Sequence, residues 1–177
     1  MRSIGFGLTS AIICAGVLLG GVARAQTAPA TPAPDAVPEA LPFDIPYGAP
    51  ITIDHAKKAA GAAEAECRKH NWKMAITIVD PSGGLVFFEK MDGTQNASVV
   101  ISEHKARAAA TFRRETKAFE DLIGKGTMYV MTLDGVIGSR GGLPLVEKGK
   151  IIGAIGVSGG AGAQDLTCAQ AGADTVK

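Results

Sequence analysis

The sequence predicts an α+β domain, an antiparallel five-stranded sheet flanked by helices. Short apolar segments come in pairs joined by tight turns, such as residues 80–84 and 148–149, which is typical of β-hairpins. Alanine-rich segments with helical spacing lie before, between and after these pairs. Because a hairpin joins neighbouring antiparallel strands, this order of elements favours an antiparallel sheet covered by helices.

The first 50 residues are expected to lie outside this domain. Residues 1–25 have a basic start at Arg2, a long apolar run and a final Ala-x-Ala motif, the pattern of a secretory signal peptide. Residues 26–50 are rich in Ala, Thr and Pro, and frequent proline opposes both helix and sheet. We therefore expect a signal peptide, a disordered leader and one domain over residues 51–177. The protein should be periplasmic or secreted, with no membrane insertion after cleavage.

The charge balance argues against a nucleic-acid partner. The chain has 18 Lys and Arg against 17 Asp and Glu, a net charge of +1. Removing the signal peptide takes away two arginines and no acid, so the mature chain stays close to neutral. Such a chain has no basic field to attract phosphates, and 5% aromatic residues offer few platforms for stacking bases.

Helical spacing and capping residues define four helices. Thr52 and Ser98 stand where N-caps are expected for the first two. The predicted helices span residues 53–71, 98–112, 116–123 and 164–177.

Alternating apolar residues define the five strands. The predicted strands span residues 74–79, 85–91, 128–133, 143–147 and 150–158. The last strand has one nearly bare face, formed by Ile152, Ala154, Gly156 and Ser158. Such a face allows either close packing of a helix or room for a flat ligand or a second subunit, and the sequence does not decide between them.

Two cysteines remain after cleavage, Cys67 in the first helix and Cys168 in the last. They are either two small buried apolar residues or a disulfide between the helices, which an oxidising compartment would permit. No C-x-x-C or Cys/His spacing indicates a metal site.

The three histidines are too few and too scattered for a three-histidine metal site. His104 differs from the other two because it shares a helix face with Ile101, Ala108 and Phe112. A histidine so placed is either a satisfied core or interface residue, or, with Lys105 beside it, a ligand to a haem whose propionates need cations. No nucleophile motif or acidic pair indicates catalytic residues.

Several ordered motifs resemble those of the GlcG/HbpS family of haem-binding, or haem-degrading, domains. They lie between about Ile51 and Lys177 in plausible order and spacing. The motifs are residues 79–86 (VDPSGGLV), 90–93 (KMDG), 97–98 (AS), 105–109 (KARAA), 141–144 (GGLP) and 153–160 (GAIGVSGG).

This resemblance implies an antiparallel sheet flanked by helices, assembly into dimers or larger rings, and bound haem in some members. One secreted member of the family is an accessory to a sensor kinase. We therefore expect an exported homo-oligomer that binds haem, or a similar flat or small organic ligand, in a cleft between subunits. His104 is the expected axial ligand to the metal, and Lys105 and Arg140 are the expected propionate partners.

Two rival functions stay open. One is a small-molecule lyase, an isomerase or a haem-degrading enzyme acting in the same cleft. The other is an accessory module for a membrane sensor, with the Pro-rich leader as a tether.

Overall fold

The computed structural model describes residues 37, 39–41 and 43–176. The predicted signal peptide and most of the predicted leader lie outside the described residues. Within the described part of the chain, no helix is long and apolar enough to cross a membrane.

The sheet has four strands in the order β2-β1-β4-β3, and all neighbouring strands are antiparallel. Its two hairpins, β1–β2 and β3–β4, are the ones that the turn residues predict. The strands are β1 (Ala75–Val79), β2 (Leu85–Lys90), β3 (Gly142–Glu147) and β4 (Lys150–Ser158). The longest strand, β4, occupies an inner position, with Thr77 of β1 opposite its Gly156.

The prediction of a fifth strand over residues 128–133 is wrong. This segment forms the short 3-10 helix η1 (Met128–Thr132). Gly126 and Gly135 on either side of it have the left-handed φ values +87° and +82°, so the chain turns sharply before and after the segment. A short apolar run has no helix or strand preference of its own, and here the flanking turns decide the outcome.

Four helices complete the domain. They are α1 (Ile53–Lys69), α2 (Ser98–Thr111), α3 (Lys117–Gly124) and α4 (Gly162–Ala173). Thr52 caps α1 as predicted, because its hydroxyl accepts the His55 N–H at 3.3 Å. Ser98 does not cap α2. It is the first residue of the helix, and its buried hydroxyl lies 3.3 Å from that of Ser158 on β4.

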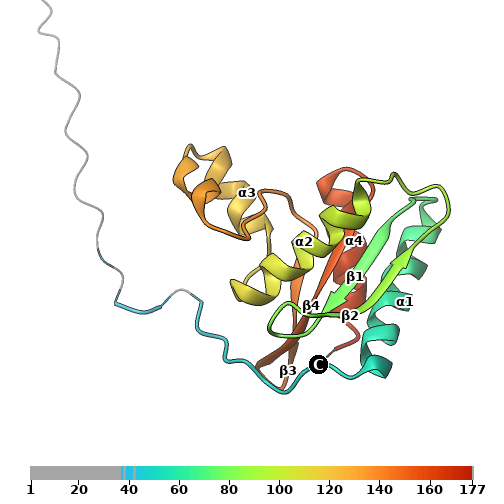
Figure 1. Ribbon diagram of the computed structural model, residues 1–177, viewed down its shortest axis with the longest axis horizontal. Coiled ribbons are helices and arrows are strands. Elements are labelled where there is room, and N and C mark those ends of the chain that lie inside the picture. Colours follow the sequence, from blue (N-terminus) through green and yellow to red (C-terminus); the bar gives the residue numbers. More distant parts are fainter. Residues whose placement is uncertain (1–36, 38, 42, 177) are drawn as a thin grey trace, which may run out of the picture. The chain divides into compact units, whose positions relative to one another are not determined.

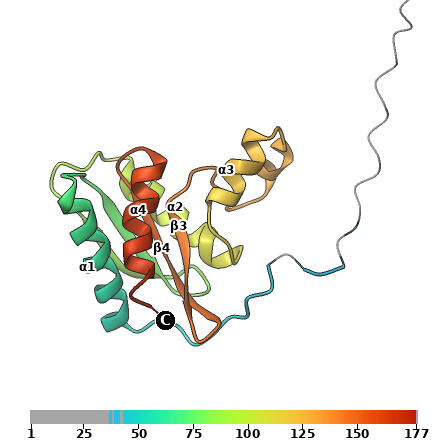
Figure 2. The ribbon, with the colours of Figure 1, turned by 180° about the vertical axis from the view of Figure 1, so that it is seen from behind.

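The sheet lies between two layers of helix. α1 and α4 pack side by side on one face, and α2 crosses the other face (Figures 1 and 2). The first face buries the larger apolar side chains of the sheet, including Ile76 and Ile155, against alanines of α1. The α2 face is lined by smaller groups, with Val79 and Ala154 packed on Ala106 and Ala109.

The bare face of β4 is filled by α2. A Cβ added to Gly156 would lie 2.1 Å from the Ser102 carbonyl oxygen and 2.5 Å from the Ala106 nitrogen, so the helix backbone rests directly on the strand. The hydroxyls of Thr77 and Ser102 also form a hydrogen bond across this contact, with their oxygens 2.9 Å apart. Of the two interpretations of this face, close helix packing is therefore confirmed, and the face has no room for a flat ligand.

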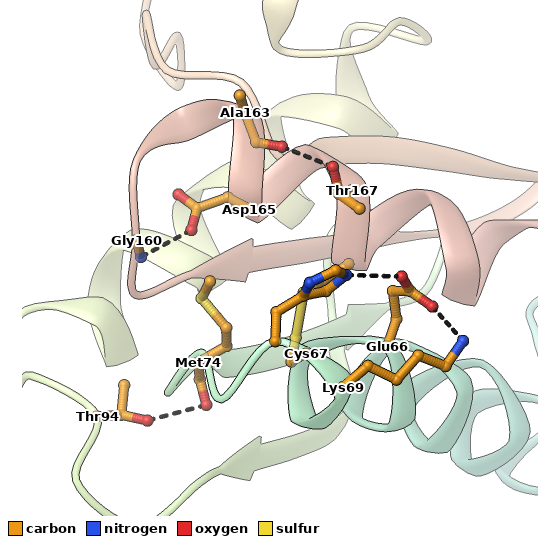
Figure 3. Close-up of a disulfide and its surroundings, with 11 residues drawn as sticks. Glu66, Cys67, Lys69, Met74, Thr94, Gly160, Ala163, Asp165 and Thr167 are labelled. Atoms are coloured by element: carbon orange, nitrogen blue, oxygen red, sulfur yellow. Dashed lines mark hydrogen bonds and ion pairs between the residues drawn. A yellow bond between two sulfur atoms is a disulfide. The ribbon is translucent and has the colours of Figure 1, made fainter.

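A disulfide between Cys67 and Cys168 links α1 to α4, with the Cα atoms 5.6 Å apart (Figure 3). Both residues are fully buried. The bridge closes a loop with a sequence separation of 101 residues. Of the two interpretations of these cysteines, the disulfide is the one that the structure shows.

The last residues of the predicted leader lie against the domain. The Ile151 N–H donates to Pro46 at 2.9 Å, and the Gly48 N–H donates back to Ile151 at 2.8 Å. The Tyr47 hydroxyl donates to the Thr111 carbonyl at the end of α2 at 3.0 Å. These bonds continue the domain's hydrogen-bonding network to the N-terminal side of Ile51.

Candidate functional site

His104 lies near the middle of α2, half-buried, on a different side of the helix from the residues that touch the sheet. The other two histidines lie next to carboxylates. His55 Nδ1 lies 3.8 Å from Glu147 Oε1, while His70 Nε2 lies 3.3 Å from Glu66 Oε1 and its ring stacks on Trp72. Among the described residues, the His104 imidazole has no hydrogen bond or ion pair. Its nitrogens are therefore available to a ligand.

The predicted apolar stripe around His104 is covered at one end and open at the other. Ala108 is buried, and the Phe112 ring meets Phe119 of α3 edge to face, with centroids 5.1 Å apart. At the other end Ile101 is half-buried and Val100 is 68% exposed. His104 thus sits at the border between the covered and the open part of this surface.

Lys105 lies inside the protein. Its side chain is 1% exposed, its ammonium lies 2.7 Å from Asp165 Oδ2 of α4, and it donates to the Val157 carbonyl of β4 at 3.1 Å. The helix turns by about 100° per residue, so Lys105 points into the protein while His104 does not. A haem propionate could reach this ammonium only if it displaced Asp165.

Arg140 precedes β3 and is also paired. Its side chain forms a fork with the Glu120 carboxylate of α3, with Arg140 Nε 2.9 Å from Oε1, and its backbone N–H donates to the same carboxylate at 2.8 Å. These bonds hold the pKa of Glu120 below its usual range and raise the pKa of Arg140. Both side chains are about 30% exposed, so a second anion could still approach Arg140.

The structure brings Lys105 and Arg140 to one corner of the domain, next to the start of α4. A Cβ on Gly141 would lie 3.2 Å from Lys105 Nζ, and one on Gly162 would lie 2.8 Å from Arg140 Cγ. His104 belongs to a neighbouring surface. The three predicted site residues therefore do not converge on one cavity within a single chain.

Two acidic partners were not foreseen. No motif in the sequence singles out Glu120 or Asp165, yet each neutralises one of the predicted cations. The pairs join residues 20 and 60 positions apart, and no local pattern links them. The cation on the exposed part of α2 is Arg107, which lies one turn after His104. The side chain of Arg107 is 53% exposed and pairs with Glu103.

A second exposed apolar surface lies on η1. Met128, Tyr129 and Met131 are each more than half exposed, whereas Val130 between them is buried. Large apolar side chains gathered on one short turn are unusual for a surface that faces only water.

No group of three or more His, Cys, Asp or Glu side chains that could hold a metal ion occurs in the described ranges.

Comparison with known families decides what kind of domain this is. The family model described as haem-degrading protein HbpS-like matches residues 51–174. The chain belongs to this family. The matched range covers the whole sheet and all four helices, so the expected resemblance to GlcG/HbpS domains is confirmed.

Curated relatives agree with the assignment to the HbpS-like family. Protein GlcG of Escherichia coli K12 is 40% identical over 97 residues, which cover 55% of this chain and 72% of GlcG. An uncharacterised 15.0 kDa protein of Citrobacter freundii, from the dhaT–dhaS intergenic region, is 35% identical over 130 residues, which cover 71% of this chain and 92% of that protein.

Solved structures share the HbpS-like fold. Klebsiella pneumoniae ORFY has a TM-score of 0.69 at 28% identity, covering 77% of this chain and 97% of its own. A double mutant of Streptomyces reticuli HbpS has a TM-score of 0.68 at 26% identity, with coverages of 81% and 99%. PduOC, solved as a haem complex, has a TM-score of 0.66 at 22% identity, covers 72% of this chain and 96% of its own, and shows the fold alone.

Proposed function

We propose that this protein binds haem at an interface between two copies of the chain, with His104 as the axial ligand. The observation that carries the proposal is the unpartnered imidazole of His104. It is half-buried on α2 at the edge of an apolar surface, whereas the other two histidines lie next to carboxylates. A histidine imidazole is the proximal ligand of haem iron in several classes of haem protein.

The surroundings of His104 suit a flat apolar ring. Ile101 and Val100 lie one turn before it and offer apolar surface, and Arg107 one turn after it offers a cation for a propionate. Lys105 and Arg140 remain predicted propionate partners. Lys105 would have to exchange Asp165 for the propionate, whereas the partly exposed Arg140 could bind a propionate while it stays paired with Glu120.

A second copy of the chain would supply the other wall of the site. One chain covers only the Ala108 and Phe112 end of the stripe and leaves Val100 exposed. The exposed Met128, Tyr129 and Met131 of η1 are a further apolar surface that association would cover. A homo-oligomer with haem in an interface cleft would bury both surfaces.

The disulfide supports an exported protein. Buried disulfides persist in oxidising compartments and are rare in the cytosol, so the Cys67–Cys168 bridge favours a periplasmic or secreted location. This agrees with the predicted signal peptide over residues 1–25.

The family model is described as haem-degrading, and PduOC of the same fold is described in complex with haem, which favours haem as the ligand.

Haem titration of the purified protein tests the proposal. We expect a Soret shift that saturates with added haem, and native mass spectrometry should find the bound haem on an oligomer. His104→Ala should abolish the shift, and His70→Ala should leave it unchanged because His70 is already bonded to Glu66. The proposal is wrong if the protein gives no shift, or if folded His104→Ala binds haem like the unmodified chain.

A further inference from the structure

A pocket of about 360 Å³ opens at the end of the domain where α1 finishes and α4 begins. Trp72 and Lys73, which follow α1, form one side, and Gln164 in the first turn of α4 forms another. Gln95, just before α2, also lines the pocket. His104, Lys105 and Arg140 do not line this pocket, so it is separate from the proposed haem site.

The amide side chains of this pocket offer hydrogen-bond donors. Gln164 Oε1 already accepts the Ala161 N–H at 2.9 Å, and Asn71 Oδ1 already accepts the Lys73 ammonium at 2.7 Å. With their oxygens used in this way, both amides have their NH₂ groups left for a ligand. A ligand that fits these groups must bring acceptors.

The charged side chain that lines the pocket is positive. Lys73 is the charged residue among those that line it, and no acidic side chain lines it. The first turn of α4 adds the positive end of a helix dipole.

An acidic group behind the floor is neutralised inside the protein. Asp165 Oδ1 accepts the N–H of Gly160, a lining residue, at 3.0 Å, as Figure 3 shows. Its other oxygen binds the buried Lys105 ammonium at 2.7 Å. The buried pair therefore fixes the floor of the pocket without making it negative.

Part of the pocket wall is held in place by packing. Trp72 is stacked on His70, with ring centroids 4.3 Å apart, and Met74 at the base is fully buried. A Cβ on Gly159 would lie 2.1 Å from the Lys73 carbonyl oxygen and 2.7 Å from Met74 Sδ, so the glycine loop is packed closely onto this strand end.

We propose that this pocket binds a small organic acid through its carboxylate. The carboxylate would accept hydrogen bonds from the NH₂ groups of Gln164 and Asn71 and would lie next to the Lys73 ammonium, while Trp72 would contact the carbon chain. The residues that line this second site do not include the predicted haem partners His104, Lys105 and Arg140.

The test is an NMR titration of ¹⁵N-labelled protein with acetate, succinate and citrate, and with acetamide and succinamide as uncharged matches. We expect the Gly160 amide, the Gln164 side-chain NH₂ and the Trp72 indole signals to shift with at least one acid and not with the amides. Lys73→Gln should weaken binding by about fivefold, the size of one exposed charge contact.

Gln164→Glu is a sharper variant, because glutamate retains the cap to the Ala161 N–H and replaces the NH₂ donor by a negative charge. It should abolish binding while leaving the fold intact. Lys69→Gln is the matched control, since Lys69 pairs with Glu66 at the end of α1 and does not line the pocket. The proposal is overturned if none of the three acids shifts these signals, if the amides shift them equally, or if Lys73→Gln and Gln164→Glu both bind like the unmodified protein.

Discussion

The ammonium of Lys105 lies 2.7 Å from the Asp165 carboxylate, and both side chains are almost completely buried. The pair connects α2 to the start of α4, and through Val157 and Gly160 it also holds the end of β4 and the glycine loop that follows. No buried side-chain nitrogen or oxygen in the described part of the chain lacks a hydrogen-bond partner. The buried polar side-chain atoms in this part of the chain are therefore all paired. Removing one partner would leave the other buried without a hydrogen bond.

Removing one member of this pair should strongly destabilise the fold. Lys105→Met leaves the Asp165 carboxylate buried without a counter-charge, which costs about 3–5 kcal/mol. Urea unfolding followed by circular dichroism should show a lower midpoint. Lys69→Met, which breaks an exposed pair with Glu66, should leave the midpoint unchanged. Equal effects of the two substitutions would contradict the role assigned to the buried pair.

Loss of the disulfide should lower stability without changing the fold. A closed loop of this length is worth about 4–5 kcal/mol through the entropy of the unfolded chain. The Cys67→Ala, Cys168→Ala double variant should unfold at a lower temperature than the oxidised protein, as measured by calorimetry. Reductant should lower the unfolding temperature of the unmodified protein alone. A variant as stable as the oxidised protein would show that the bridge contributes nothing.

Two glycine-to-alanine substitutions should have opposite effects. Gly156→Ala forces a methyl group against the α2 backbone and should cost about 1–3 kcal/mol. Gly61→Ala, in α1, meets nothing within 4 Å and should stabilise the helix by about 0.5–1 kcal/mol. Chemical unfolding of both variants measures the difference. If Gly156→Ala were neutral, α2 would not rest on β4 as described.

Glu89 on β2 should make stability depend on pH. Burial, followed by the nearby Glu64, raises the pKa of this carboxyl. A raised pKa means that the folded state holds this proton more tightly than the unfolded state, so its contribution to stability falls as pH rises from the unfolded to the folded pKa. Glu89→Gln should therefore raise the melting temperature at neutral pH.

The same substitution should have little effect in acid, below both pKa values, where the carboxyl is already protonated in both states. Melting curves of the two proteins across this pH range provide the measurement. A constant difference between the two proteins at every pH would contradict a titrating origin and indicate a packing effect instead.

Much of the fold follows from local signals in the chain. Thr52 marks the start of α1, and residues 80–84 and 148–149 fix both hairpins, because capping and turn conformations depend on a few adjacent residues. The η1 segment was predicted wrongly because a short apolar run lacks such a signal, and its conformation depends on where the chain goes next.

The site was less predictable than the fold. Helical spacing places His104 on one face of α2 with Ile101, Ala108 and Phe112, but spacing alone cannot show that Lys105 meets Asp165 or that Arg140 meets Glu120. These partners come from other helices and are set by tertiary packing. The sequence also could not show what covers the β4 face that contains Gly156. A strand face without large side chains has the same sequence pattern whether a helix or a ligand packs on it.

The inner position of β4 has a consequence for how the chain folds as it emerges from the ribosome. When β1 and β2 have emerged, they can form only a hairpin, since the strand that pairs with the other edge of β1 starts at Lys150. The cysteine partner of Cys67 follows even later, at Cys168 in the last helix. The domain therefore cannot close until nearly its whole length has emerged, so that most of the chain is synthesised before the sheet and the disulfide can be completed.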